Sequence, residues 1–329
     1  MEKKFGFIKM DLSEFEIWMK NLRVSRTVLK IQQHHTYIPS YIHFTGNNHF
    51  ERQKAMKEYH VTSNGWKDIG QHFTVFPDGT IVTGRSMEDS PACIYGQNAN
   101  SVCIENFGNF DKGEDEMTKE QKASIVRITA LLCQKFNIPV STDFIVYHHW
   151  FDLSIGVRNN GIRNNKSCPG TNFFGGNKVA DCQKNFIPLV DAILPSTIKT
   201  DVSEVVKFVC VTASTLNIRT EPTTSSPRAV DRPTVSLGAI LRIYEEKEGW
   251  LKISKTDSRW VSARYVNVVE RAIVTATVLN IRTGPGTSFP KTEILLKGEI
   301  VFVTEIQEHW CKIGLEDKWV SKEYLQFKN

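Results

Sequence analysis

Apolar residues follow two different periods along the chain. They first recur at helical spacing in two segments, formed by Phe15, Trp18, Met19 and Leu22 and by Ile125, Ile128, Leu132 and Phe136. From about residue 207 onward they alternate with polar residues in short runs broken by Gly, Pro and Asp, which is typical of half-buried strands. The pattern predicts an α/β part followed by an all-β part.

Capping motifs predict where the two helices begin. Ser13-Glu14-Phe15-Glu16 has the Ser-x-x-Glu form of a capping box, and Thr118-Lys119-Glu120-Gln121 has the Thr-x-x-Gln form. The second helix is expected to end before Pro139, because proline cannot continue a helix.

Strand-like runs complete the first part of the chain. His72–Phe76 and Thr80–Thr83 flank the turn sequence Pro77-Asp78-Gly79 and predict a hairpin. Further strands are expected at Val28–Gln33, Ser101–Glu105 and Phe144–Tyr147. Strands interleaved with helices predict an α/β domain, a mixed central sheet with flanking helices, which we assign to residues 1–195.

An internal repeat organises the second part. Leu216-Asn217-Ile218-Arg219-Thr220 recurs as Leu279-Asn280-Ile281-Arg282-Thr283, an offset of 280 − 217 = 63 residues. The segments Trp250–Ile253 and Arg259–Ser262 recur in the same order as Trp310–Ile313 and Lys318–Ser321. Repeats of this size predict two small all-β barrels, at 207–270 and 271–329, after a linker at 196–206.

Two sets of repeat residues have more than one interpretation. Asn217 and Asn280 are equally suited to a local backbone turn and to contact with a ligand. Trp250 and Trp310 each begin an alternating strand, so we expect them to be buried in the barrel cores.

Composition narrows the choice of partner only slightly. A chain of 329 residues is long enough for two or three domains, and its 40% hydrophobic and 23% charged residues are ordinary for globular proteins. The formal charge of +5 suits an anionic partner such as a cell wall, a nucleic acid or a membrane surface. No basic block or basic-aromatic ladder marks a nucleic-acid face, so no nucleic acid is expected as partner.

The N-terminal segment and the cysteines bear on the compartment. Met1–Met10 has no apolar core of secretory length and no run is long enough to span a bilayer. We therefore expect synthesis in the cytoplasm without a signal peptide, and no membrane insertion. Seven cysteines without close pairing argue against a disulfide framework, and apart from Cys168 they are expected to be small apolar core residues.

Three segments carry residues suited to a metal ion. His34-His35-Thr36 and His148-His149 each end a predicted strand, and Lys166-Ser167-Cys168-Pro169-Gly170 lies in a loop rich in Asn and Gly. Imidazole and thiolate are preferred ligands of Zn²⁺, and three protein ligands leave a fourth position open for water. Because successive strand residues point to opposite faces, only one His of each pair can be a ligand.

In their order along the chain these segments resemble the type 2 N-acetylmuramoyl-L-alanine amidases, whose fold is shared with phage amidase-lysozymes and animal peptidoglycan-recognition proteins. The resemblance covers residues ~24–194 and includes His34-His35-Thr36, Gly65-Trp66, Asp68–Phe73, Asp78-Gly79-Thr80, Gly84-Arg85, Cys103–Asn106, Gly108-Asn109-Phe110, His148, Lys166 and Cys168-Pro169-Gly170. Residues ~207–329 resemble bacterial SH3-like cell-wall domains through the repeated Leu-Asn-Ile-Arg and Trp-Val-Ser motifs.

The resemblance implies a zinc amidase that cleaves the bond between the lactyl group of N-acetylmuramic acid and L-alanine. His34, His148 and Cys168 match its metal ligands, so Zn²⁺ is the expected cofactor. Glu105 would be the general base and Lys166 would stabilise the tetrahedral oxyanion. Bacterial peptidoglycan is the expected partner, held by the two repeats, and the sequence indicates no oligomeric state.

The chain departs from the family pattern in two places. Gln71 replaces a tyrosine of many relatives, so any proton transfer assisted by that tyrosine is absent and more of it falls to Glu105. The segment Trp150–Ser167 is longer than usual, and its Gly and Asn residues suggest a flexible loop beside the cleft. It would either shape specificity or be a tolerated insertion.

Two other functions remain open at this point. One is a non-catalytic peptidoglycan receptor, although receptors with this fold that lose the metal also lose a ligand, and all three ligands are present here. The other is a cysteine endopeptidase using Cys93 or Cys103, although neither stands at a helix start that would lower its pKa. Wall-binding repeats without an export signal favour a lysin that reaches the wall after lysis or through pores.

Overall fold

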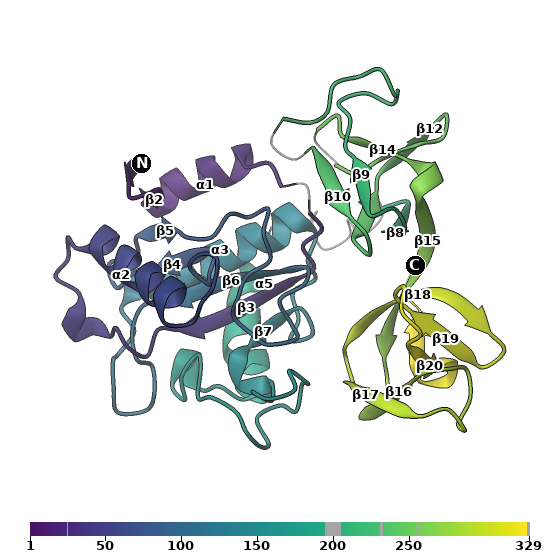
Figure 1. The fold of residues 1–329 in the computed structure, drawn as a ribbon. Helices are drawn as coiled ribbons and strands as arrows, with labels where there is room; N and C mark the ends of the chain where they lie inside the picture. Colours follow the sequence, from purple (N-terminus) through teal and green to yellow (C-terminus); the bar gives the residue numbers. More distant parts are fainter. Residues whose placement is uncertain (25, 195–204, 231–232, 255–256, 328–329) are drawn as a thin grey trace. The chain divides into compact units, whose positions relative to one another are not determined.

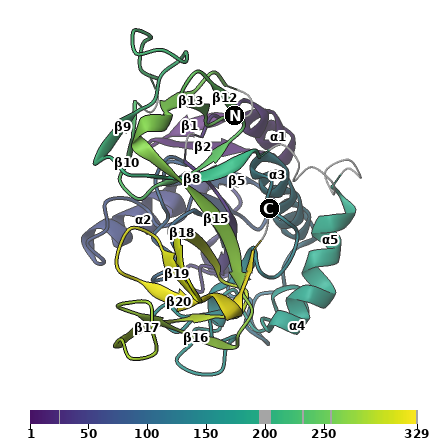
Figure 2. The ribbon, with the colours of Figure 1, turned by 90° about the vertical axis from the view of Figure 1, so that its right-hand side faces the viewer.

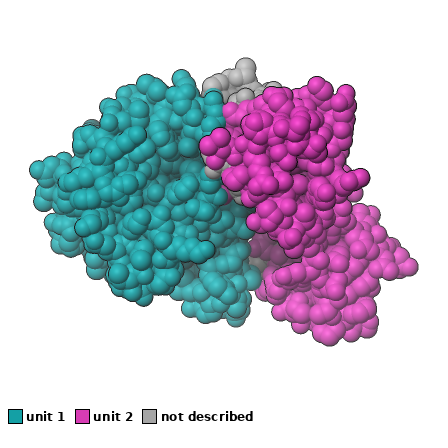
Figure 3. Space-filling view, turned by 45° about the horizontal axis from the view of Figure 1, so that its top comes forward, with its two compact units in different colours: residues 1–24, 28–200 teal, residues 25–27, 201–329 magenta. Residues whose placement is uncertain are grey.

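Figure 1 shows a computed structural model that describes residues 1–329 except 25, 195–204, 231–232, 255–256 and 328–329. The chain forms two compact units, coloured separately in Figure 3: residues 1–24 with 28–200, and residues 25–27 with 201–329. Most of the predicted linker at 196–206 lies outside the described residues. No helix in the described part of the chain is long and apolar enough to cross a bilayer.

A mixed sheet forms the centre of the first unit. Its strand order is β1 (Glu2–Lys4), β2 (Phe7–Met10), β5 (Ile81–Thr83), β4 (Phe73–Val75), β6 (Ser101–Asn106), β3 (Lys30–His35) and β7 (Ile145–Tyr147). The neighbours from β1 to β4 are antiparallel and those from β4 to β7 are parallel. The predicted mixed sheet, hairpin and three further strands are confirmed. The β1–β2 hairpin has no apolar alternation in its exposed first strand, so the pattern does not reveal it.

Helices cover both faces of this sheet (Figures 1 and 2). Phe73, Ile104 and Gln33 are aligned across β4, β6 and β3 and therefore share one face. The Phe73 ring contacts Phe15 of α1 (Leu12–Asn21), and Gln33 Nε2 donates to Thr129 of α3 (Lys119–Phe136) at 2.8 Å. The helix α2 (His49–Thr62) lies on the opposite face. That second face carries the candidate site.

Both capping predictions need correction. The helix α1 begins two residues earlier than predicted, because Asp11 is the N-cap: its carboxylate accepts from Glu14 N at 2.8 Å, and Glu14 accepts from Asp11 N. Thr118 does cap α3, but the side chain of Gln121 does not return to it. Gln121 donates instead to the carbonyls of Val75 and Phe107, which fastens α3 to the sheet. The predicted inward face of α3 is confirmed as buried.

The helix α2 is absent from the sequence prediction. Its buried residues include two polar side chains, His49 and Gln53, beside Phe50 and Met56, so the helix has little apolar periodicity. His49 Nε2 bonds Asp78 at 2.8 Å and Gln53 Nε2 donates to the Thr83 carbonyl at 3.1 Å. The polar contacts that bury α2 are the reason why its pattern is hidden.

The cysteine prediction is wrong for one pair. Cys93, in the loop before β6, is disulfide-bonded to Cys103 within β6, with a Cα–Cα distance of 6.8 Å. A spacing of ten residues across an irregular loop gives no periodic indication that the chain folds back on itself. The other cysteines predicted as core residues are buried free thiols, namely Cys133, Cys182, Cys210 and Cys311.

Short helices complete the first unit. They are Tyr41–His43, His148–Trp150, Phe173–Gly175, α4 (Val179–Asp181), Cys182–Phe186 and α5 (Ile187–Ala192).

Strands dominate the second unit, as predicted. One sheet has the order β11 (Ile240–Ile243), β8 (Lys207–Val211), β15 (Val266–Val274), β18 (Ile300–Gln307), β19 (Trp310–Ile313), β20 (Trp319–Ser321), β16 (Val278–Arg282) and β17 (Lys291–Leu296), with β21 (Leu325–Phe327) against β15. β9 (Thr215–Asn217) pairs with β10 (Thr234–Ser236), and β13 (Trp250–Lys252) lies between β12 (Glu245–Lys247) and β14 (Trp260–Ser262). One-turn helices at Ala263–Tyr265 and Lys322–Tyr324 occupy matching places in the repeats.

Each repeat has its own apolar core. One core is built around Val209, Ile218 and Val261, and the other around Val274, Ile281 and Val320. β15 belongs to both, because its first residues pair with β8 and its last with β18 and β21. The predicted boundary between 270 and 271 thus falls within one continuous strand.

The repeat motifs have matching roles, with one correction. Arg219 Nη1 donates to the Ser226 carbonyl at 2.6 Å, and Arg282 Nη1 donates to the Phe289 carbonyl at 2.7 Å, so each arginine closes the turn that follows it. Trp250 and Trp310 are only half-buried. The buried tryptophans are the second ones of each repeat, Trp260 and Trp319. The prediction failed because the next residue of each strand, Leu251 or Cys311, packs into the core, so that Trp250 and Trp310 point to the other face.

Candidate metal centre

Strand register brings two predicted site residues together. His34 of β3 is paired with Glu105 of β6, and Gln32 with Cys103, in the parallel register of these strands. Paired residues project to the same face, so His34, Glu105 and Cys103 share the face opposite α3. The same strands thus supply both a predicted metal ligand and the predicted base.

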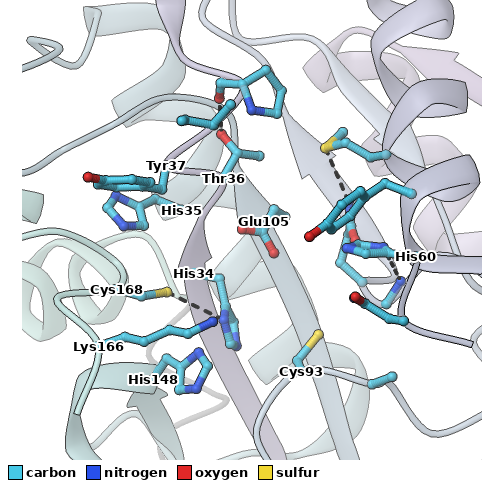
Figure 4. A pocket seen from close by; sticks show the side chains of 18 of the residues that line it. His34, His35, Thr36, Tyr37, His60, Cys93, Glu105, His148, Lys166 and Cys168 are labelled. Atoms are coloured by element: carbon cyan, nitrogen blue, oxygen red, sulfur yellow. Dashed lines mark hydrogen bonds between the residues drawn. The ribbon is translucent and has the colours of Figure 1, made fainter. Parts of the chain in front are cut away.

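His148 and Cys168 complete the group. His148 follows β7 directly, and its ring centroid lies 4.9 Å from that of His34. Cys168 Sγ lies 3.5 Å from His34 Nδ1. One ligand atom from each of His34, His148 and Cys168 lies within 4.8 Å of the others. Figure 4 shows the three side chains gathered on one side of the pocket. The structure brings together the three residues predicted as ligands.

The neighbouring histidines have other partners. His35 also lines the cavity, but its Nδ1 accepts a hydrogen bond from Phe110 N at 3.1 Å. His149 donates from Nδ1 to the Lys166 carbonyl at 2.6 Å, and its Nε2 bonds Lys178 Nζ at 2.8 Å. Both His149 nitrogens are therefore engaged, whereas His34 Nε2 is buried with no partner among the described residues. The geometry favours the first His of each pair as the available ligand.

Backbone contacts fix the loop that carries Cys168. The Cys168 carbonyl accepts from His149 N at 2.6 Å, which ties the loop to the segment of His148. Gly170 has φ +118°, and a Cβ there would lie 2.4 Å from the Phe110 carbonyl carbon. Only glycine allows this approach, which explains the Gly that follows Cys168-Pro169.

Electrostatics keeps the donors neutral in the absence of a metal ion. Burial lowers the pKa of His34 well below its ordinary value and that of His148 to about 3, with Lys166 adding to the shift of His148. Burial, followed by the charge of Glu105, raises the pKa of the Cys168 thiol. Burial also raises the pKa of Glu105 to about 8, and the nearby Lys166 opposes that shift. A neutral imidazole has a lone pair with which it can bind a cation. A bound divalent cation would also favour the ionised forms of the Cys168 thiol and the Glu105 carboxyl group.

The site lies in a cavity of about 940 Å³. His34, Glu105, His148 and Cys168 line it, and the side chain of Lys166 reaches from its rim toward the two histidines (Figure 4). The opposite wall comes from α2 and the segment after β3, with Tyr37, Ile38, Arg52, Met56 and Tyr59. The sequence prediction missed this wall because it missed α2.

Gln71 also lines the cavity and is fully buried. Its Nε2 donates to Thr74 Oγ1 at 3.0 Å, whereas its Oε1 has no partner among the described residues. An amide side chain therefore lines the cavity at the position where many relatives are expected to have a tyrosine.

Histidines without a predicted role serve local structure. These histidines are His43, His49, His60 and His72, and their ring nitrogens form hydrogen bonds with backbone groups or with Asp78.

The asparagines that suggested a flexible loop at Trp150–Ser167 have fixed hydrogen-bond partners instead. Asn164 Nδ2 donates to Asp152 at 3.0 Å, and Asn165 Nδ2 donates to the Phe151 carbonyl at 2.8 Å. Of this loop, only Lys166 and Ser167 line the cavity among the described residues.

Comparison with known proteins agrees with this geometry. A model of the N-acetylmuramoyl-L-alanine amidase family matches residues 27–171, the segment that holds every residue of the site. Residues 27–171 are therefore similar to this amidase family. A bacterial SH3 domain model matches residues 277–326, within the second repeat.

Individual relatives match parts of the amidase domain. Peptidoglycan-recognition protein SC2 of Drosophila melanogaster is 28% identical over 141 residues, which cover 40% of this chain and 68% of that protein. An endolysin of Enterobacteria phage K11 is 31% identical over 75 residues, 22% of this chain and 49% of the endolysin. A human N-acetylmuramoyl-L-alanine amidase is 31% identical over 77 residues, so the chain spans only 13% of its length.

Solved structures of similar proteins include Drosophila PGRP-LB, with 23% identity, a TM-score of 0.37, and coverage of 48% of this chain and 81% of that one. The amidase LysC of Clostridium intestinale has 28% identity, a TM-score of 0.34, and coverage of 45% of this chain and 80% of that one.

Proposed function

We propose that the protein is a zinc-dependent peptidoglycan amidase that cleaves the bond between N-acetylmuramic acid and L-alanine. The observation that carries the proposal is the convergence of His34, His148 and Cys168 beside Glu105 on one wall of a single cavity. The family match to residues 27–171 supports the reaction class.

The donor set fits Zn²⁺. Two imidazoles and one thiol are ligands that zinc prefers, and a three-ligand set leaves a position open for a water or substrate oxygen. His34 Nε2 is buried without a hydrogen-bond partner among the described residues. Cys168 Sγ lies close to His34 Nδ1, so the potential ligand atoms converge. A zinc ion bound by these residues supplies Lewis-acid chemistry, polarising the scissile carbonyl and lowering the pKa of a water.

Glu105 is proposed to move the proton. Its carboxylate stands beside His34 in the strand register and lines the cavity, so it is placed to take a proton from a water that enters the site. It takes a proton from that water and gives it to the departing L-alanine amine, which needs a proton to leave as a neutral amine. Burial raises its pKa to about 8, and a nearby cation restores the ionised base.

Lys166 is proposed to stabilise negative charge that develops on the carbonyl oxygen. Its ammonium group reaches toward His34 and His148 (Figure 4), and its charge lowers the pKa of both histidines and of Glu105. An ammonium group in this position would stabilise an oxyanion more than a neutral carbonyl, which would lower the barrier to attack.

The two repeats are proposed to hold the enzyme on the cell wall. The second repeat matches a bacterial SH3 domain, and the first repeats its strand order and its Arg-closed turn. One relative is named an endolysin. We propose that this protein likewise acts on the wall after release by lysis or through pores.

A non-catalytic receptor is the second candidate, because several relatives are named peptidoglycan-recognition proteins. The two functions separate in one assay. Purified full-length protein is stripped with a chelator, reloaded with zinc and mixed with cell walls, and new amino groups and bound protein are both measured. An amidase releases amino groups only when loaded with zinc, and Glu105→Ala binds walls without releasing them. Wall binding without release by the zinc-loaded wild type would indicate a receptor.

A further inference from the structure

A second set of potential metal ligands adjoins the proposed amidase centre. Cys103 projects from β6 on the same face as His34, and Cys93 lines the cavity. A ring nitrogen of His34 and the sulfurs of Cys93 and Cys103 all lie within 4.8 Å of one another. Cys93 and Cys168 lie on opposite sides of His34 in Figure 4. His34 therefore belongs to two groups of donors.

His34 can serve only one group at a time. Its side chain is 4% exposed, its Nδ1 faces Cys168, and its Nε2 is buried without a partner among the described residues. A neutral imidazole has one nitrogen with a free lone pair and one that carries a proton. Binding of a cation by one group therefore withdraws His34 from the other.

We propose that Cys93 and Cys103 form a redox-controlled second site, with His34, for a thiophilic divalent cation such as Zn²⁺. In the disulfide the sulfurs carry no charge and bind zinc poorly. As thiolates they are strong zinc ligands, and with His34 they make a three-ligand set. Oxidised protein keeps His34 for the amidase centre, and reduced protein diverts it. The effect on amidase activity rests on the proposed function, but the second site itself does not.

The switch needs a dithiol reductant. One reductant thiolate attacks the sulfur of Cys93, a half-buried residue that lines the cavity, and Cys103, which is fully buried, leaves as a thiolate. The second reductant thiol then displaces Cys93, so two electrons and two protons reach the protein and the reductant becomes a disulfide. Zinc binding releases the two thiol protons. A disulfide oxidant reverses the sequence.

Cobalt(II) tests the site without reference to activity, because thiolate ligands give it a sulfur-to-metal charge-transfer band. Full-length Cys168→Ser protein lacks the thiolate of the amidase centre. After reduction by a dithiol and removal of the reductant, it should show the band with one equivalent of cobalt, and the oxidised protein should not. Adding Cys93→Ser should abolish the band. Reduced Cys168→Ser protein without the band would overturn the proposal.

Wild-type protein gives a second measurement if Cys168→Ser does not fold. The charge-transfer band of its cobalt complex should strengthen on reduction, because the number of thiolate ligands rises from one to two. An unchanged intensity would contradict the second site. With one equivalent of zinc, the ratio of reduced to oxidised amidase rate should fall severalfold for wild type and stay near one for Cys93→Ser/Cys103→Ser. If the two proteins show equal rate ratios, the proposal that reduction diverts His34 from the amidase centre is wrong. If the oxidised, zinc-loaded wild-type protein is inactive, the proposed amidase function fails. The cobalt measurement still tests whether the second metal site exists.

Discussion

His34 and Glu105 stand side by side on parallel strands, paired in the register of β3 and β6. This pairing places a proposed metal ligand and a proposed proton carrier on one rigid support. A shift of one residue in either strand would turn one of the two toward α3. The register of the sheet is therefore a condition for the chemistry, and four predictions follow from the residues around it.

Removing Glu105 should abolish proton transfer and leave the metal centre intact. We expect Glu105→Ala and Glu105→Gln to lower kcat by about 10²–10⁴-fold, the range typical of general acid–base groups. Zinc content, measured by elemental analysis, should stay at the wild-type level. Full cleavage by Glu105→Ala would refute the mechanism even if zinc is bound.

The His-His pairs offer matched variants. His34 and His35 are neighbours on β3 with 4% and 6% exposure, so substitutions at both disturb similar packing. We expect His34→Gln to lose more zinc affinity than the roughly 10–100-fold that loss of an outer-shell partner costs. His35→Gln should lose far less, because His35 bonds Phe110 N. Competition with a chromophoric chelator measures both, and equal losses would count against His34 as the ligand.

Lys166 should affect the rate and spare the metal. Lys166→Ala is expected to lower kcat by about 10²-fold, the order found on removing one oxyanion-stabilising group. Lys119→Ala, at the exposed start of α3, is the control for the loss of one positive charge. If both variants behave alike, Lys166 contributes only to the general charge of the protein.

Burial of Glu105 predicts a pH-dependent stability in zinc-free protein. Its pKa is raised from 4.5 to about 8. Between these two pH values the carboxyl group is protonated in the folded state and ionised in the unfolded state. The stabilisation is present below about pH 4.5 and is lost as the pH rises through about 8. The Gln side chain of Glu105→Gln does not titrate. The thermal unfolding midpoint of this variant should therefore rise relative to that of wild type as the pH rises.

Added zinc should shrink this difference, because a nearby cation lowers the pKa of a carboxyl group. A constant difference between the two midpoints at all pH values, in the absence of zinc, would show that Glu105 does not titrate as described.

The sequence predicted much of this arrangement and missed its opposite wall. Alternation and helical spacing located β3, β6, β7 and α3, and residue types alone predicted His34, His148 and Cys168 as potential metal ligands, which the structure brings together. Periodicity did not show α2, whose buried His49 and Gln53 make hydrogen bonds that form only in the folded chain. Because α2 was not predicted, the positions of Arg52 and Tyr59 in the cavity wall were not predicted either.

Two further differences have the same cause. The disulfide of Cys93 with Cys103 depends on how an irregular loop returns to β6, which no periodic pattern records. The half-burial of Trp250 depends on which face of its strand packs into the core, and it is the next residue, Leu251, that does so. Local patterns specify elements, whereas these features depend on contacts between segments distant in the fold.

The position of the cleaved bond tests the central claim most directly. Zinc-loaded protein is incubated with defined peptidoglycan in ¹⁸O-labelled water, and the fragments are identified by mass. The account predicts ¹⁸O in the lactyl carboxyl group of N-acetylmuramic acid and a free amino terminus on L-alanine. Label at a sugar reducing end, or in a carboxyl group of the stem peptide or cross-bridge, would contradict it.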